Sequence, residues 1–263
     1  PSTARHVIRN SAENFAEVSL ELGGKSPFIV FDDADIESAV NGSIAGIFGA
    51  SGQSCVAGSR LYLHESIADE FLDKMLNLAS KIKLGDPLQE ETQMGPLATL
   101  GQMNLIENEI SNAKAQGATI LHGGKRPSNA NGGWFYEPTI VDCHDQKLKI
   151  VDTELFGPVL SVIRFKSEEE VIKLANDTKY GLAAGVFTKN GARSLRVTKA
   201  LRAGIVWVNT YRVVSPIAPF GGYKDSGYGR EAECRQFMII HASKQFGLIH
   251  LMSLCQTHFR CAK

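Results

Sequence analysis

The sequence predicts an α/β domain built on a mostly parallel sheet with helical crossovers. Short segments rich in Val, Ile, Leu and Phe alternate along the chain with longer segments whose apolar residues recur at helical spacing. Turns that contain Gly and Pro separate many of these segments, and parallel strands are joined by crossovers that are usually helices. With 263 residues, of which 43% are hydrophobic, the chain is long enough to bury a substantial core.

Strands are expected where short apolar runs lie between turns. The run Pro-Phe-Ile-Val-Phe at 27–31 is apolar throughout, which is typical of a strand buried on both faces of a sheet. A preceding strand at 18–22 is expected to carry Glu21 near its end, where burial would raise the pKa of the carboxyl group. The expected strands are residues 18–22, 27–31, 60–64, 119–122, 159–165, 185–188 and 205–208.

Helices are expected where the apolar residues follow helical periodicity. Residues 36–50 show this spacing, and Asp33 or Asp35 is placed to cap the first turn. The expected helices are residues 3–16, 36–50, 67–82, 102–116, 168–176 and 192–200. The Gly- and Pro-rich stretches 84–96 and 123–133 are expected to be surface loops.

The charge balance argues against a nucleic-acid or anionic-membrane partner. The chain has 28 Lys and Arg against 28 Asp and Glu, and the basic residues are dispersed among carboxylates rather than gathered in a stripe. No uninterrupted apolar run approaches the length of about 20 residues that spans a bilayer. Charged residues also recur through the N-terminal segment, so neither a membrane partner nor a signal peptide is expected.

The five cysteines form an odd number, which favours reduced thiols over a disulfide framework and predicts a cytoplasmic protein. The spacing Cys255-x-x-His258-x-x-Cys261 lacks a fourth ligand, so no metal site is expected. The chain begins with Pro1 rather than Met, which favours a fragment or a processed protein.

Cys55 is the strongest candidate for a catalytic residue. It follows the small residues Gly52 and Ser54 on a predicted turn between a helix and a strand, where a thiol can be partly exposed and a substrate carbon can approach the sulfur. A lone cysteine is more often a small buried hydrophobe, so the assignment depends on the surrounding motifs.

Four motifs occur in order along the chain. They are Leu20-Glu21-Leu22-Gly23-Gly24-Lys25, Gly52-Gln53-Ser54-Cys55, Glu154-Leu155-Phe156-Gly157-Pro158-Val159, and Pro219-Phe220-Gly221-Gly222-Tyr223-Lys224 followed by Ser226-Gly227-Tyr228-Gly229-Arg230-Glu231. Each is short enough to occur by chance, but four in one order are not a plausible coincidence. The set resembles the aldehyde dehydrogenase superfamily, and the resemblance covers residues 1–232.

The resemblance implies an oxidoreductase that converts an aldehyde to a carboxylic acid with NAD or NADP, NAD being favoured, through a cysteine thiohemiacetal and thioester. It also implies three parts: a remnant of a Rossmann-like nucleotide-binding domain at 1–23, a catalytic domain at 24–225, and a C-terminal segment at 226–263 that becomes atypical after Ala232. The chain is then a fragment that lacks most of the N-terminal nucleotide-binding domain. Full-length relatives are expected to be homodimers or homotetramers.

The resemblance assigns the two catalytic roles. Cys55 adds to the small-molecule aldehyde, and its backbone N–H is placed to stabilise the oxyanion that forms. Glu21 activates the water that hydrolyses the thioester. An arbitrary glutamate is more often a capping or surface residue, so this role rests on the Leu-Glu-Leu-Gly-Gly context.

Other motif residues are implied to bind ligands. Glu154 accepts hydrogen bonds from the nicotinamide ribose, and Phe156 packs beside it. The Leu22 carbonyl contacts the carboxamide, and Gly23 lets the backbone approach the nicotinamide ring. Phe220 lines the aldehyde pocket, although a core aromatic before a Gly-Gly turn is the alternative.

The sequence also departs from the family pattern. Pro1 and His6 stand where the phosphate-binding helix of relatives has glycines, although Ser2 is kept and is expected to face the cofactor phosphates. The asparagine that supplies a second oxyanion donor in the family has no counterpart here. The alternative function is therefore an inactive fragment or a weak, cofactor-independent thiol esterase that uses Cys55.

Overall fold

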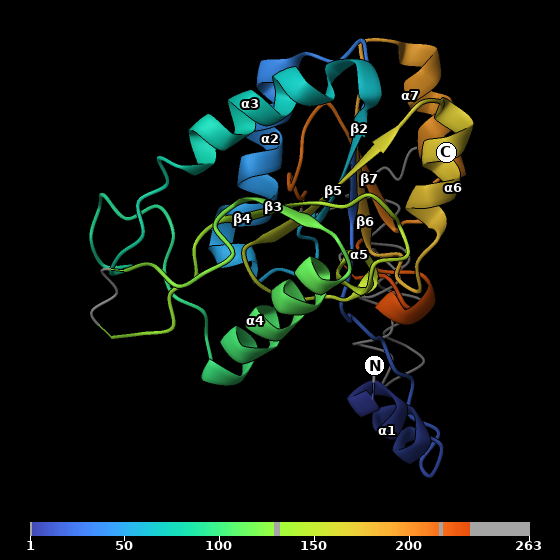
Figure 1. Cartoon of the computed structure of the whole chain (residues 1–263). Helices are drawn as coiled ribbons and strands as arrows, with labels where there is room; N and C mark the ends of the chain where they lie inside the picture. The colour runs from blue at the N-terminus through green and yellow to red at the C-terminus, as the bar shows by residue number, and fades with distance from the viewer. Residues whose placement is uncertain (1, 129–131, 216–217, 232–263) are drawn as a thin grey trace.

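The computed structural model describes residues 2–128, 132–215 and 218–231. Within these residues one seven-stranded sheet has the order β3-β4-β5-β2-β1-β6-β7 (Figure 1). Neighbouring strands are parallel except for the antiparallel pair β3 and β4, so the predicted mostly parallel α/β fold is confirmed. The strands are β1 (Pro27–Val30), β2 (Arg60–His64), β3 (Thr119–His122), β4 (Thr139–Asp142), β5 (Val159–Phe165), β6 (Ala183–Phe187) and β7 (Ile205–Val208).

Helices cover both faces of the sheet. Residues of α2 and α3 join the core cluster on one face, and residues of α4 to α7 join the cluster on the other. In Figure 1, α1 projects away from these layers. The helices are α1 (Ser2–Ser11), α2 (Ile36–Phe48), α3 (Ala68–Ala79), α4 (Leu100–Ala115), α5 (Lys149–Asp152), α6 (Glu168–Asn176) and α7 (Gly191–Ala200), with 3-10 turns η1 (Gly49–Gly52), η2 (Glu65–Ile67) and η3 (Lys224–Ser226).

The apolar run in β1 divides between the two core clusters. Phe28 and Val30 pack on the side of α2 and α3, whereas Ile29 packs on the side of α4 to α7. Successive side chains of a strand point to opposite faces, so a strand buried on both faces must be apolar throughout. β1 lies between β2 and β6, as this pattern predicts.

Several predicted boundaries are confirmed and others differ. β2, β3, β5 and β7 begin and end where the sequence predicts, and the Asp35 carboxylate caps α2 by accepting a 2.9 Å hydrogen bond from Ser38 N. β4 and α5, of four residues each, were not predicted. The first helix ends at Ser11 rather than at residue 16.

The predicted strand at 18–22 is wrong. Leu20 N–H donates to Tyr228 O at 2.9 Å, and Leu22 N–H donates to Ser226 O at 3.1 Å. The backbone hydrogen bonds of this segment therefore go to a loop, and the segment joins no strand of the sheet. Glu21 consequently lies on an extended segment and not at the end of a strand.

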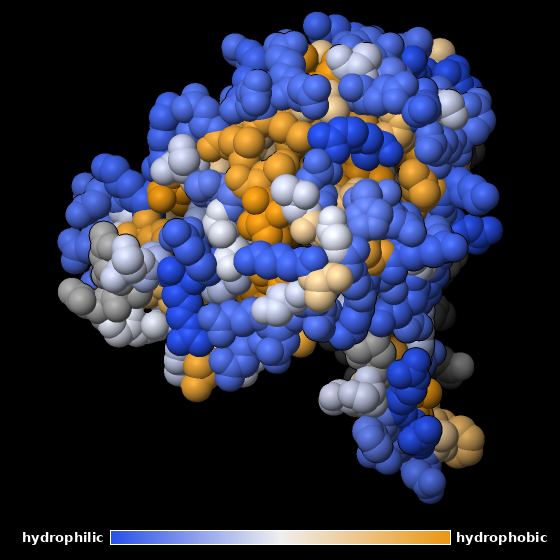
Figure 2. All heavy atoms as spheres, viewed as in Figure 1, coloured by the Kyte–Doolittle hydropathy of each residue, from blue (hydrophilic) through white to orange (hydrophobic). Residues whose placement is uncertain are grey.

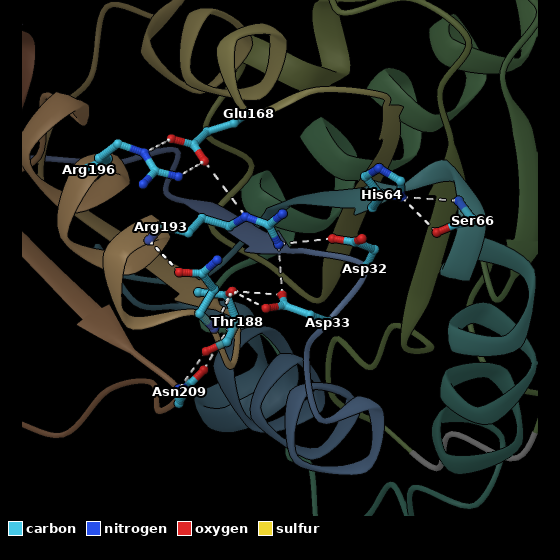
Figure 3. Close-up of polar contacts among 10 residues, drawn as sticks. Asp32, Asp33, His64, Ser66, Glu168, Thr188, Arg193, Arg196 and Asn209 are labelled. Carbon is cyan, nitrogen blue, oxygen red and sulfur yellow. Dashed lines mark hydrogen bonds and ion pairs between the residues drawn. The ribbon is translucent and has the colours of Figure 1, made fainter.

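A polar network links α7 to the residues that follow β1 and to the start of α6 (Figure 3). Arg193 Nη1 donates to Asp32 Oδ1 and to Asp33 Oδ1, each at 2.9 Å. Glu168 accepts two hydrogen bonds of 2.8 Å from Arg196. The network lies beyond the carboxyl end of β1, where parallel sheets often bind ligands, but arginines of the chain already pair with its carboxylates.

Figure 2 shows hydrophilic side chains over most of the viewed face, with apolar side chains gathered between α3 and α4. In the parts of the chain that the structure describes, no helix has both the length and the apolar character that crossing a bilayer requires.

Candidate active site

Three loops that precede strands meet at the amino ends of β1, β2 and β5. They belong to the motifs that contain Gly24, Cys55 and Glu154. Residues of all three loops, among them Gly24, Ser54 and Glu154, line one small cleft. These three loops therefore come together at the end of the sheet opposite the network in Figure 3.

Cys55 lies on a turn between η1 and β2, as predicted. Three residues of η1 have left-handed backbone conformations: Ala50 with φ 54°, Ser51 with φ 55° and Gly52 with φ 71°. This conformation costs roughly 1–2 kcal/mol for a residue that has a side chain. A Cβ atom at Gly52 would lie 2.1 Å from Gly157 O, so only glycine lets the cysteine turn lie against the loop before β5.

The Cys55 side chain is half-buried, and its thiol is free. Burial raises the pKa of this thiol, the N–H groups of Val56 and Cys55 oppose the rise, and the charges of Glu21 and Glu154 add to it. Reactive cysteines usually have a lowered thiol pKa. The resting group is therefore a thiol, and any reaction at its sulfur needs a proton acceptor.

Glu21 is exposed, which corrects the expectation that it is buried at the end of a strand. Partial loss of solvent around the carboxyl group still raises its pKa, the charge of Glu231 raises the pKa further, and Arg230 lowers it. A carboxylate with a raised pKa is a better general base near neutral pH. The predicted direction of the pKa shift is therefore correct, although the local structure differs.

Glu154 is half-buried and touches the glycine pair of the first motif. Its Oε1 accepts a 2.9 Å hydrogen bond from Gly24 N, and a Cβ atom at Gly23 would lie 1.9 Å from its Oε2. Burial raises the pKa of the Glu154 carboxyl group, whereas the Gly24 hydrogen bond and the charge of Lys25 lower it. The Gly-Gly sequence thus lets the carboxylate lie directly against the backbone.

Two aromatic residues border this region. Phe156 has a left-handed φ of 49° and is 41% exposed. Phe220 is partly buried and packs, as Cys55 does, against one apolar cluster, whose buried members are Val56, Leu182, Ala183 and Trp207.

The fourth motif holds the first one in place. Ser226 Oγ donates a 2.6 Å hydrogen bond to Gly23 O and accepts one of 3.0 Å from Gly181 N. A Cβ atom at Gly227 would lie 1.9 Å from Leu20 O. Four motifs that are far apart in the sequence are therefore neighbours in the fold.

Ser2 is exposed at the first residue of α1, and Leu22 is partly exposed on the extended segment, where its N–H donates to Ser226 O. The ligand-binding roles of these two residues, like those of Gly23, Glu154, Phe156 and Phe220, stay predictions. The Cys255-x-x-His258-x-x-Cys261 spacing lies outside the described residues. Among those residues, no cluster of three or more His, Cys, Asp or Glu could hold a metal ion.

Lys25 ends the first motif, directly after the two glycines. Its side chain is buried, and Nζ has no hydrogen-bond partner among the residues that the structure describes. Burial and the nearby Arg60 lower the pKa of Lys25 to about 8. The sequence alone does not predict this burial of Lys25, because the burial of a lysine depends on tertiary packing.

In this mostly parallel α/β fold, the turn that carries the free Cys55 thiol lies against two glycine-rich loops, one of which carries the half-buried Glu154 carboxylate. This arrangement favours a thiol-dependent enzyme. The model of the aldehyde dehydrogenase family matches residues 1–244, so the chain belongs to this family.

Relatives and solved structures agree with this assignment. The (Z)-2-((N-methylformamido)methylene)-5-hydroxybutyrolactone dehydrogenase of Acinetobacter baylyi is 57% identical over 232 residues, which are 88% of this chain and 47% of that protein. The chloroplastic betaine aldehyde dehydrogenase of Atriplex hortensis is 48% identical over 230 residues, 88% of this chain and 46% of that protein. A structure of betaine aldehyde dehydrogenase from Staphylococcus aureus in complex with NAD+ has a TM-score of 0.85 and 44% identity, and the match covers 87% of this chain and 46% of that one. The chain thus spans about half the length of the curated relatives that it matches.

Proposed function

We propose that this chain is the catalytic part of an enzyme that oxidises a small-molecule aldehyde to a carboxylic acid with NAD(P)+. The observation that carries the proposal is the convergence of Glu21, Cys55 and Glu154, whose loops come from distant parts of the sequence. The negative charges of both carboxylates raise the pKa of the Cys55 thiol, which supports a site that the three groups share. Membership of the family supports the same reaction class.

The first step is addition of the Cys55 sulfur to the carbonyl carbon, because a trigonal aldehyde carbon is a poor hydride donor. A C–S bond forms, the C=O π electrons move to oxygen, and the thiol proton leaves to solvent water. The N–H groups of Cys55 and Val56 are directed at the sulfur and are available to the oxyanion that forms beside it. Bound NAD(P)+ supplies the acceptor for the hydride.

The acyl group must then leave Cys55 as a carboxylic acid. The Glu21 carboxylate removes a proton from water, the water oxygen bonds to the thioester carbon, and the C–S bond breaks. The sulfur leaves with the bonding electrons and is reprotonated. Glu231 supports this role of Glu21 because its negative charge raises the pKa of the Glu21 carboxyl group.

The surroundings of Glu154 fit a nicotinamide ribose. Oε1 is occupied by Gly24 N–H, whereas Oε2 has no hydrogen-bond donor among the described residues and remains available to a ribose hydroxyl. Gly23 has no side chain to block Oε2, and the exposed Phe156 ring offers an apolar surface on the same loop. These observations support Glu154, Gly23 and Phe156 as cofactor-binding residues.

We extend the proposal to the remaining ligand contacts. The Leu22 carbonyl and the Ser2 hydroxyl are proposed cofactor contacts, and NAD is favoured because the Staphylococcus aureus structure contains NAD+. Phe220 is proposed to line the aldehyde pocket, since it shares an apolar cluster with Cys55. Relatives named betaine aldehyde and aminoaldehyde dehydrogenases supply the first substrates to test.

For the whole protein we propose that a nucleotide-binding domain joins this catalytic part near residue 23 and that the enzyme is a homodimer or homotetramer. The five cysteines favour a reducing compartment, and we propose the cytoplasm. Relatives named chloroplastic and peroxisomal define the alternative locations.

The reaction is tested with this chain joined to the N-terminal half of the Acinetobacter baylyi relative, because the relatives are about twice as long as the match. The joined protein is expected to form NADH with at least one aldehyde of a panel that includes betaine aldehyde and aminoaldehydes. Cys55→Ala should abolish NADH formation. Glu21→Gln should give an initial burst of NADH and a covalent acyl adduct that is visible by intact-protein mass spectrometry.

Glu17→Gln is the matched control, because Glu17 is exposed on the same extended segment. Its turnover should equal that of the parent. Turnover of Glu21→Gln within a few-fold of the parent would show that Glu21 is structural. If the parent joined protein forms no NADH with any aldehyde of the panel, the proposed reaction is contradicted.

A further inference from the structure

We propose that residues 95–102, which lead into α4, form a clamp that positions the Cys55 turn against the loop before β5, with Gln53 and Gln102 as the positioning residues. The inference deepens the proposed function and rests on it. It assigns a role to a stretch that the sequence marks only as part of a surface loop and the start of a helix.

The Cys55 turn has an unfavourable backbone conformation that needs support from other residues. Ala50 and Ser51 both have side chains and both adopt left-handed conformations, with ψ values of 33° and 30°. Two such residues in succession are intrinsically unfavourable, so contacts from outside the turn must hold them. The sequence immediately around the turn offers no proline that would restrict the backbone.

Residues 95–98 supply those contacts. Ser51 Oγ donates a 2.9 Å hydrogen bond to Gly95 O. Gln53 Oε1 accepts a 2.8 Å hydrogen bond from Ala98 N, and its Nε2 donates to Pro96 O at 3.5 Å. One glutamine side chain thus joins the turn to two backbone groups on either side of buried Leu97.

The first turns of α4 hold the other loop. Gln102 Nε2 donates a hydrogen bond to Leu155 O, between the proposed ribose-binding residues Glu154 and Phe156. A Cβ atom at Gly157 would lie 2.3 Å from Ile106 Cδ1, so α4 also packs against the backbone of this loop.

The clamp itself is well anchored. Thr99 Oγ1 accepts a 3.1 Å hydrogen bond from Gln102 N and thereby caps α4. Leu97 is buried, and its N–H donates a 2.9 Å hydrogen bond to Trp134 O. The same anchored segment therefore contacts the nucleophile turn at one end and the proposed ribose loop at the other.

Release of the clamp has a predictable effect on Cys55. The N–H groups of Cys55 and Val56 favour the thiolate, and they do so only while the turn keeps its conformation. If the turn relaxes, these groups move away from the sulfur and the thiolate fraction at a given pH falls. Iodoacetamide reacts with the thiolate, so its rate of reaction with Cys55 reports on the clamp.

The experiment uses the 263-residue chain and needs no cofactor. Gln53→Met and Gln102→Met keep the length of the side chain and remove its polar end, and Gln116→Met is the control at the exposed far end of α4. Peptide mass spectrometry gives the alkylation rate of Cys55 and of Cys143 between pH 7 and 10. We expect both clamp variants to slow Cys55 alkylation about 3- to 10-fold near pH 8, as loss of one or two hydrogen bonds predicts, and to shift its pH profile upward. The control should match the parent.

Cys143 separates positioning from unfolding because it is buried in the core. A rise in Cys143 alkylation would show that a variant opens globally. In that case Ser51→Ala, which removes only the bond to Gly95, must show the slower Cys55 reaction with Cys143 unchanged. An unchanged Cys55 rate, a faster one, or an effect of Gln53→Met without any effect of Gln102→Met would overturn the clamp. If iodoacetamide alkylates Cys55 of the parent chain no faster than Cys143, the result contradicts the proposed function, in which Cys55 is the nucleophile, rather than the clamp.

Discussion

The backbone N–H of Gly24 donates a 2.9 Å hydrogen bond to Oε1 of Glu154, and these two residues are 130 positions apart in the sequence. A similar close approach brings Gly52 against Gly157. A Cβ atom at the neighbouring Gly23 would lie 1.9 Å from Glu154 Oε2, and one at Gly52 would lie 2.1 Å from Gly157 O, so both approaches need glycine. The spacing of the three loops around Cys55 therefore depends on backbone contacts that tolerate little change.

The contact of Gly52 with Gly157 predicts a large effect on stability. Gly52→Ala adds a Cβ atom 2.1 Å from a backbone oxygen and forces alanine into a left-handed conformation. We expect the free energy of unfolding to fall by about 2–4 kcal/mol, measured by urea denaturation. Gly191→Ala is the control, because Gly191 begins α7 and has open space around its Cα. Similar losses in the two variants would refute the close-contact argument.

The environments of the two described cysteines predict different reactivity. Cys55 is half-buried, whereas Cys143 is in the core, where burial raises the pKa of its thiol to about 11. Iodoacetamide should therefore label Cys55 faster than Cys143 at neutral pH, as peptide mass spectrometry can show. If the chain is a weak esterase, Cys55→Ala should also abolish its hydrolysis of an activated ester without cofactor, while Cys143→Ala should not. Equal labelling of both thiols in the folded protein would argue against Cys55 as the nucleophile.

Lys25 predicts an unusual dependence of stability on pH. Its native pKa of about 8 lies below the ordinary value of 10.5, so the unfolded state binds more protons between these two values. The free energy of unfolding contributed by Lys25 therefore rises with pH across this window, and below pH 8 the buried ammonium costs about 3 kcal/mol. Relative to Lys25→Met, the parent should gain stability as the pH increases from 8 toward 10.5.

Urea denaturation at several pH values within this window measures the difference between parent and variant. Lys189→Met is the control, because Lys189 is exposed after β6 and should give a constant difference. A constant difference for Lys25→Met as well would show that the lysine is not a buried cation in solution.

The network in Figure 3 predicts a structural role for Arg193. This side chain donates to Asp32 and Asp33, and its guanidinium lies 4.6 Å from the centre of the Phe31 ring. Arg193→Ala removes the cation that two adjacent carboxylates share, so we expect a loss of about 1–3 kcal/mol in the free energy of unfolding. Arg9→Ala on exposed α1 should change it by less than about 0.5 kcal/mol. Equal changes in the free energy of unfolding for Arg193→Ala and Arg9→Ala would mean that the network contributes nothing to stability.

Local periodicity was sufficient for most of the fold. The apolar run of β1 and the helical spacing of α2 report burial directly, because a side chain's face follows from its position in a strand or helix. For residues 18–22, periodicity gave a wrong prediction of a strand. Its apolar residues resemble a strand, but its hydrogen-bond partners at Ser226 and Tyr228 are about two hundred positions away, and no local pattern specifies them.

The sequence alone determined which residue types the site contains: a cysteine on a turn, two glutamates in separate motifs, and the glycines beside them. Only the tertiary structure decided the surroundings of these groups. It placed them together at the amino ends of β1, β2 and β5, exposed Glu21, buried Lys25 without a partner, and joined the Cys55 turn to Ala98 through Gln53. The physical reason is that pKa, burial and backbone strain depend on neighbours in space, and those neighbours are set by strand order and loop packing rather than by adjacent residues.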